Sequence, residues 1–180
     1  MPTIITFSGK AGHGKDTAVQ ILCDLLADCN KKGLKINYTD YLKFVASKYY
    51  NWDGNKDESG RSFLQFLGAE KVNGICPTFW VDTVIRIVEI IGHDYDFVLI
   101  GDCRFRHDIE RWIDEGYDVL PFHVERVNYV NDLTDEQKNH ASENSLKGYE
   151  FAACLSSCDI AGLKEELVNK VMPLCRGYFN

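Results

Sequence analysis

Residues 7–17 read FSGKAGHGKDT, and this stretch decides which fold the sequence predicts. Gly9, four intervening residues, Gly14 and Lys15 have the G-x-x-x-x-G-K spacing of a phosphate-binding loop. A β-rich run at 3–8 precedes the loop, and residues 15–32 have the apolar periodicity of a helix. Glycines let backbone N–H groups turn toward an anion, and a helix N-terminus favours negative charge. The stretch therefore predicts a phosphate site between a strand and a helix.

The residue after the lysine departs from the usual motif. Asp16 stands where such loops carry Ser or Thr for Mg²⁺, and Thr17 follows one place later. "GKDT" is the layout of many nucleoside monophosphate kinases, with Thr17 placed for an α-phosphate oxygen. Asp16 either stabilises the positive helix end or has a catalytic role, and the sequence leaves both open. The residues expected to hold the donor phosphates are Gly9, Lys10, Ala11, Gly12, His13, Gly14, Lys15, Asp16 and Thr17.

Composition limits the classes of protein that fit this chain. Its 180 residues are 45% hydrophobic and 26% charged, as expected of one soluble domain. A net charge of -7 argues against a nucleic-acid binder, which needs a basic face. No apolar run approaches the roughly 20 residues that cross a membrane, and the N-terminus has no basic signal-peptide region. The seven scattered cysteines indicate free thiols, so we expect a cytoplasmic protein without a membrane partner.

Strand and helix patterns alternate along the chain. Strands are expected at 3–8, 34–39, 96–102 and 117–126, with a short apolar piece at 151–156. Helices are expected at 15–32, 40–50, 60–73, 77–91, 105–115 and 161–172, with Gly33 and Gly116 ending two of them. Such alternation predicts an α/β domain with a parallel sheet covered on both faces. Ligands of such sheets bind beyond the carboxyl ends of the strands, which places residues 8–15, Asp40 and residues 102–104 along one edge.

The run "LIGDCRF" supplies a second group of candidate residues. Asp102 ends a continuous apolar strand, where it could hold Mg²⁺ through water. Arg104 lies two residues further on and could reach a transferring phosphoryl group. The alternative is an Asp–Arg pair that only stabilises the turn. Next to a phosphate loop, the pair favours the catalytic interpretation.

Two later segments carry further polar groups. Arg61 and Gln65 are four residues apart and share a helical face. The arginine could hold a monophosphate and the glutamine could contact a base edge, although a solvated surface charge is the simpler interpretation of Arg61. Residues 134–137, TDEQ, have the pattern of a capping box. The polar residues His140, Ser142 and Glu143 follow, with a spacing that favours a hydrogen-bonded loop over a zinc site. Arg126 ends the preceding strand and adds a cation at the same mouth.

In this order, the blocks "FSGKAGHGKDT", "TDYLKFVASKYYNWD", "RSFLQFLGAEKVNG", "FWVD", "GDCRF" and "HASENSL" resemble the phage-type deoxynucleoside monophosphate kinases, within the P-loop group. The resemblance spans nearly the whole chain, and its D-x-R-F and H-x-S-E blocks are more specific than the loop. It departs at Arg106, His107 and Asp108, where the family usually has Pro-Asn-Glu.

The resemblance implies a three-layer αβα P-loop kinase fold with a five-stranded parallel sheet, formed by residues 1–180 as one domain. It implies ATP as donor, Mg²⁺ near Asp102, and a deoxynucleoside 5′-monophosphate as acceptor. An acceptor-binding helical segment is expected at about 40–92 and a lid-like segment at about 127–147. The catalytic candidates are Lys15, Asp102, Arg104 and Arg126. The substrate-binding candidates are Asp40, Arg61, Gln65, Trp80, Arg104, His140 and Glu143.

Two other functions fit the same residues. One is a different small-molecule P-loop kinase, of the dephospho-coenzyme A or phosphomevalonate type. The other is an ATP-binding switch without an acceptor, which the Arg61 face disfavours because a switch needs no second anion pocket. The sequence leaves open the base, the sugar and whether the chain forms a homodimer.

Overall fold

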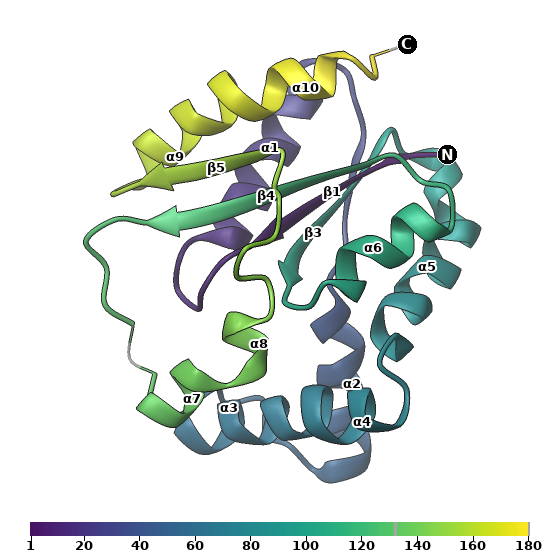
Figure 1. Ribbon diagram of the computed structural model, residues 1–180. Helices are drawn as coiled ribbons and strands as arrows, with labels where there is room; N and C mark the ends of the chain where they lie inside the picture. Colours follow the sequence, from purple (N-terminus) through teal and green to yellow (C-terminus); the bar gives the residue numbers. More distant parts are fainter. Residues whose placement is uncertain (132, 180) are drawn as a thin grey trace.

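The computed structural model describes residues 1–131 and 133–179, and a five-stranded sheet forms its centre. The strands are β1 (Thr3–Ser8), β2 (Gly33–Lys35), β3 (Phe97–Cys103), β4 (Val119–Arg126) and β5 (Ala153–Ser157). Their order is β2-β3-β1-β4-β5, and all neighbours are parallel. Ser8 pairs with both Cys103 and His123, so the end of β1 lies between the ends of β3 and β4 (Figure 1). The expected parallel sheet is confirmed.

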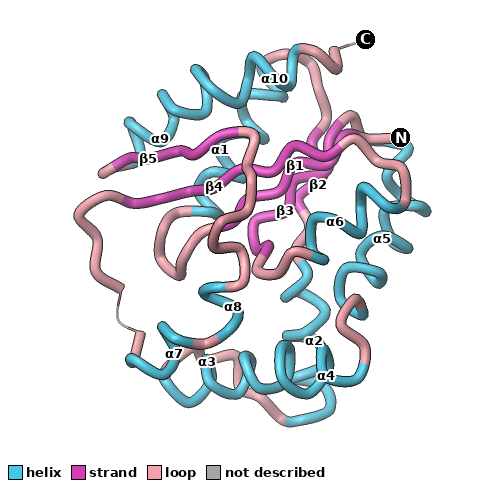
Figure 2. The backbone as a smooth tube through the Cα atoms, in the orientation of Figure 1, coloured by secondary structure: helices cyan, strands magenta, loops and turns pink. Residues whose placement is uncertain are grey.

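Helices cover both faces of this sheet (Figure 2). One layer contains α1 (Lys15–Asp28), α9 (Ile160–Glu166), η3 (Leu167–Val171) and α10 (Met172–Arg176). The other contains α2 (Tyr38–Tyr50), α5 (Phe79–Ile91), the single turn η2 (Gly92–Asp94) and α6 (His107–Asp114). Alternate strand residues enter the two cores, with Leu99 in the first and Val98 and Ile100 in the second. Both faces are apolar, so the strands form the middle of three layers.

The remaining helices lie together at one end of the molecule (Figure 1). Residues 58–75 are continuously helical, as α3 (Glu58–Gln65), the π-helical η1 (Phe66–Val72) and α4 (Asn73–Ile75). The short helices α7 (Asp135–Asn139) and α8 (Ala141–Asn144) belong to the predicted lid-like segment. Thr134 and Gln137 form the expected capping box at the start of α7. These pieces adjoin the sheet edge where the phosphate loop begins.

Two predicted boundaries in the first 40 residues were wrong, and the last helical stretch continues past the expected residue 172 to Arg176. Gly33 does not end the first helix, because α1 stops at Asp28, Asn30 takes the left-handed conformation with φ 57°, and Gly33 begins β2. The second strand is shorter than 34–39. Asp40 Oδ2 accepts the Asn37 N–H at 3.2 Å, which caps α2 and starts that helix earlier. Asp40 is therefore in the first helical turn and not at a strand end.

Two other expectations about the chain, the helix stop at Gly116 and the free cysteines, are met. Gly116, with φ +83°, follows α6 as predicted. All seven cysteines are free thiols. Among residues 1–131 and 133–179, no helix is long and apolar enough to cross a membrane.

Candidate functional site

The glycine loop is built for close backbone approach. Gly9, Gly12 and Gly14 have φ of 141°, 78° and 91°, which side chains rarely adopt. A Cβ on Gly9 would collide with the Val124 carbonyl oxygen of β4. Gly14 is the N-cap of α1, so the loop leads directly into that helix N-terminus. The local geometry is therefore that of an anion cradle.

Lys15 lies beneath this loop, 8% exposed. Its Nζ donates to the Gly9 carbonyl at 2.8 Å and to the Lys10 carbonyl at 2.9 Å. Burial, and then the charge of Arg104, lower the pKa of Lys15 to about 7. An anion bound at the loop would favour the protonated form of this lysine.

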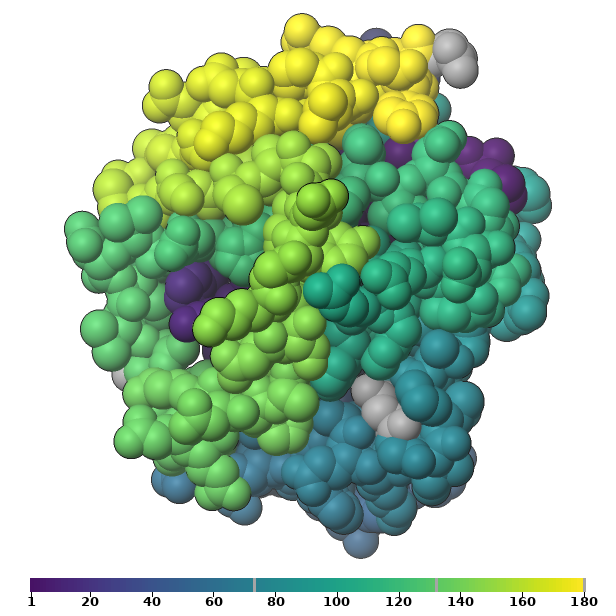
Figure 3. Space-filling model, in the orientation of Figure 1, coloured from purple at the N-terminus to yellow at the C-terminus, as the bar shows by residue number. Residues whose placement is uncertain are grey.

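A cavity of about 470 Å³ opens beside the loop. It joins the loop to the end of β3, the N-terminus of α2, the α3 stretch and the lid-like segment. Ten of the predicted site residues line it, namely Ala11, Gly12, Lys15, Asp16, Arg61, Gln65, Trp80, Asp102, Arg104 and Glu143. Figure 3 shows the N-terminal part of the chain, in purple, inside a hollow between later segments. Tertiary structure thus brings together residues that are far apart in the sequence.

Asp102 has a role that the sequence did not indicate. Its Oδ2 accepts the Thr39 N–H at 2.8 Å and its Oδ1 accepts the Tyr38 N–H at 3.2 Å. The carboxylate thereby binds the N-terminus of α2. Burial raises the pKa of Asp102, while the hydrogen bonds from Thr39 and Tyr38 oppose that shift.

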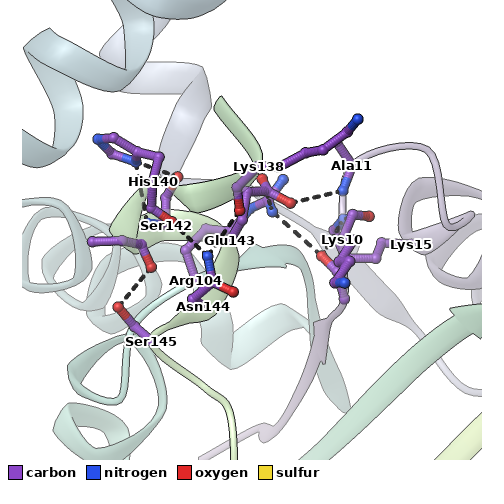
Figure 4. Close-up of polar contacts among 12 residues, drawn as sticks. Lys10, Ala11, Lys15, Arg104, Lys138, His140, Ser142, Glu143, Asn144 and Ser145 are labelled. Atoms are coloured by element: carbon purple, nitrogen blue, oxygen red, sulfur yellow. Dashed lines mark hydrogen bonds and ion pairs between the residues drawn. The ribbon is translucent and has the colours of Figure 1, made fainter. Parts of the chain in front are cut away.

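Arg104 and Glu143 form the closest ion pair of the site (Figure 4). Arg104 Nη1 donates to Glu143 Oε1 at 2.6 Å and to the Gly9 carbonyl at 3.3 Å. Glu143 Oε2 accepts the Ala11 N–H of the glycine loop at 3.1 Å. One carboxylate therefore connects α8, the end of β3 and the phosphate loop.

Asp108 supports the turn that carries Arg104. Its Oδ2 accepts the N–H groups of Arg104 at 2.8 Å and Phe105 at 2.9 Å. Burial raises the pKa of Asp108 to about 7. The sequence marked this position only as a departure from a family pattern. An acidic residue in the first turn of a helix is the signal that could have indicated its role.

The far side of the cavity is basic and aromatic. Arg61 lines it, and its Nε donates to the Lys56 carbonyl at 2.9 Å. Sequence reasoning missed Lys43 and Lys56, which line the same region. Burial, and then the charge of Lys43, lower the pKa of Lys56. Trp80 is 8% exposed and donates to the Gly68 carbonyl, so it forms a wall of the cavity.

Several predicted site residues do not line this cavity. The Arg126 guanidinium lies 4.6 Å from the centre of the Tyr129 ring, and the Arg126 N–H donates to His13 Nδ1. Asp40 faces Lys43 at 3.5 Å, and His140 caps α8 through the Ser142 N–H. The others are Gly9, Lys10, His13, Gly14 and Thr17. Gly9 and Lys10 line a second cavity, which Arg104 also lines.

Together the parallel sheet, its strand order and the strand–glycine loop–helix unit define the fold of the P-loop kinases. The chain is similar in structure to APS kinase CysC of Mycobacterium tuberculosis. A mutant of that enzyme superposes with a TM-score of 0.52 at 10% identity, over 95% of this chain and 97% of the other. Its complex with AMPPNP and APS gives a TM-score of 0.52 at 9% identity, over 95% and 98%. At this identity the likeness concerns the fold.

No profile of a known protein family matches the chain. No curated protein sequence matches it either.

Proposed function

We propose that the protein transfers the γ-phosphoryl group of ATP to a deoxynucleoside 5′-monophosphate, giving ADP and the diphosphate. The observation that carries this proposal is that Lys15, Arg104 and Arg61 all line one cavity. A kinase needs two anion sites facing one transfer point, and one cavity lined by three basic side chains can supply them.

The donor phosphates would bind at the glycine loop and the N-terminus of α1. Lys15 can turn from the loop carbonyls toward the β- and γ-phosphates, and burial strengthens its interaction with them. Arg126 ends β4, and Tyr129 follows it. Both contact His13 of the glycine loop: the Arg126 N–H donates to His13 Nδ1, and the Tyr129 ring packs against the His13 ring. The Arg126 guanidinium lies over the Tyr129 ring, and the two side chains offer a cation and an aromatic face to the donor base.

The acceptor would occupy the opposite end, between α2, α3 and α5. Lys43, Lys56 and Arg61 offer charge for its phosphate, and Gln65 offers an amide for a base edge. Trp80 and Phe105 provide apolar surface for the ring and the sugar. The resemblance of the 60–74 and 102–105 blocks to deoxynucleoside monophosphate kinases makes a deoxynucleotide the favoured acceptor.

The chemistry requires little from protein acids or bases. The acceptor phosphate is already an anion, so an oxygen of it can attack the γ-phosphorus without a general base. Lys15 and Arg104 would neutralise the charge of the transferring group. Asp16 and Asp102 are the carboxylates that would hold Mg²⁺, each lining the cavity, and the ion would supply charge neutralisation at the phosphates.

An acceptor screen tests this function. The purified protein would be incubated with ATP, Mg²⁺ and, separately, each deoxynucleoside monophosphate, each ribonucleoside monophosphate, dephospho-coenzyme A, phosphomevalonate and APS. ADP release and the phosphorylated product would be measured by chromatography. We expect product with at least one deoxynucleoside monophosphate at a higher kcat/KM than with any other acceptor.

The other results of this screen have distinct meanings. If only a coenzyme precursor or APS is phosphorylated, the protein is still a small-molecule kinase, but the proposed deoxynucleotide acceptor is wrong. ATP binding without any acceptor-dependent product would favour a nucleotide-binding switch and contradict the proposal.

A further inference from the structure

Glu143 lies where a phosphate is expected to bind. Its two carboxylate oxygens accept from the Ala11 N–H at 3.1 Å and from Arg104 Nη1 at 2.6 Å, and its side chain is 6% exposed (Figure 4). We propose that Glu143 is an internal anion that occupies part of the phosphate site and is displaced when nucleotide binds. The inference deepens the proposed function, because it takes the glycine loop as the donor site.

The two partners of Glu143 are groups that bind phosphoryl oxygens in sites of this kind. A backbone N–H of a glycine loop and an arginine guanidinium both bind the negatively charged oxygens of a phosphate group well. Lys15 is satisfied internally as well, by the carbonyls of Gly9 and Lys10. Incoming phosphates must therefore exchange with acceptors of the chain itself. While Glu143 remains in place, its negative charge also repels them.

The lid-like segment that carries Glu143 is bound to the acceptor side of the cavity. Gln137 of α7 is 4% exposed, and its Nε2 donates to Ser62 Oγ at 3.0 Å and to the Glu58 carbonyl at 3.1 Å. Both partners belong to α3, the helix that also carries Arg61. A movement of α3 on acceptor binding is thus transmitted to the segment that holds Glu143.

This connection gives Glu143 a regulatory effect. With the acceptor site empty, Glu143 pairs with Arg104 and weakens ATP binding. Weaker ATP binding lowers the rate of wasteful hydrolysis. In that reaction water attacks the γ-phosphorus, the bond to the bridging oxygen breaks, and ADP and inorganic phosphate leave. Arrival of the acceptor moves α3, releases Glu143 and frees Arg104 for the transferring group.

The test compares Glu143→Gln and Glu143→Ala with wild type. Glutamine keeps a carbonyl oxygen for the Ala11 N–H but removes the charge. The control is Glu150→Gln, an exposed glutamate further along the same stretch of chain. ATP affinity would be measured by calorimetry, and ADP release with and without the acceptor found in the screen. Far-ultraviolet circular dichroism and thermal unfolding would establish that each variant is folded.

We expect both Glu143 variants to bind ATP about tenfold more tightly and to release ADP without acceptor about tenfold faster. The ratio of ADP released with acceptor to that released without it should fall, and Glu150→Gln should match wild type. Unchanged or weaker ATP binding in a folded Glu143→Gln protein would overturn the proposal. A lower kcat with unchanged ATP affinity would instead make Glu143 a positioning residue for Arg104.

The same measurements separate this inference from the proposed function. If wild type phosphorylates a deoxynucleotide but the Glu143 variants show no tighter binding, only the inference fails. If neither wild type nor any folded variant binds ATP, the proposed function fails and the inference fails with it. If Glu143→Ala does not fold, Glu143→Gln decides the outcome.

Discussion

Asp102, at the end of β3, accepts the Thr39 N–H at 2.8 Å and so binds the N-terminus of α2 directly to the central sheet. The Asn37 side chain reinforces this contact, since its Oδ1 accepts the Gly101 N–H at 3.0 Å. Asp102, which the sequence suggested either for Mg²⁺ or for a turn-stabilising pair with Arg104, therefore fixes a wall of the cavity. Replacing Asp102 by a neutral residue therefore removes a negative charge from the cavity and also weakens the attachment of α2 to the sheet.

We predict that Asp102→Asn destabilises the protein and lowers kcat. The asparagine has one acceptor oxygen for two N–H groups, and its own NH₂ group faces a donor. The loss should cost about 1–3 kcal/mol of unfolding free energy, measured by urea denaturation. Asp114→Asn, at an aspartate of α6 whose side chain is 65% exposed and pairs with Arg111 at 3.7 Å, is the matched control. Equal stability of Asp102→Asn and wild type would contradict the capping role.

Replacing Lys15 by alanine should abolish phosphoryl transfer while the fold is kept. Removing a buried cation from the phosphate loop should lower kcat/KM at least about a hundredfold. Circular dichroism and acceptor-dependent ADP release measure the two effects. Lys48→Ala, at an exposed lysine of α2, should behave as wild type. Near-normal turnover of Lys15→Ala would remove the loop from the reaction.

Arg61→Ala should raise the KM for the acceptor about tenfold or more, with a much smaller effect on the KM for ATP. The reason is that Arg61 belongs to α3 and not to the glycine loop, and its Nε donates to the carbonyl of Lys56 on the proposed acceptor side. Steady-state kinetics with each substrate varied in turn provide the measurement. Arg86→Ala, which removes an exposed arginine paired with Glu89, is the control. Equal changes in both KM values would exclude Arg61 from the acceptor site.

Asp108 should make the protein less stable as the pH rises. Burial raises its folded pKa to about 7, so the folded state binds a proton that the unfolded chain has already lost. Its contribution is fully present below the unfolded pKa near 3.8 and is lost as the pH approaches 7. Asp108→Asn keeps an acceptor oxygen for Arg104 and Phe105, and should flatten this dependence. Denaturation of both proteins between pH 4 and pH 8 tests it, and parallel curves would contradict the assignment.

The elements of the fold were largely predictable from local sequence. The apolar run before Asp102, the Gly116 stop and the 134–137 capping box each depend on neighbouring residues, and each prediction is confirmed. The early start of α2 and the end of α1 at Asp28 were not predicted. Both boundaries depend on which residue caps the helix. Asp40 caps α2 and ends the preceding strand early, and Asn30 rather than Gly33 takes the left-handed conformation after α1. Apolar periodicity does not distinguish between such capping residues.

The sequence by itself determined the glycine loop, the strand–helix alternation and hence the class of fold, because a glycine spacing and apolar periodicity are local properties of the chain. Only the tertiary structure decided what each charged side chain contacts. The α2 N-terminus bound by Asp102, and the carboxylate of Glu143 between Ala11 and Arg104, join residues from separate parts of the chain. Such contacts arise because parallel strands end at one edge, where distant loops compete for the same hydrogen-bond donors.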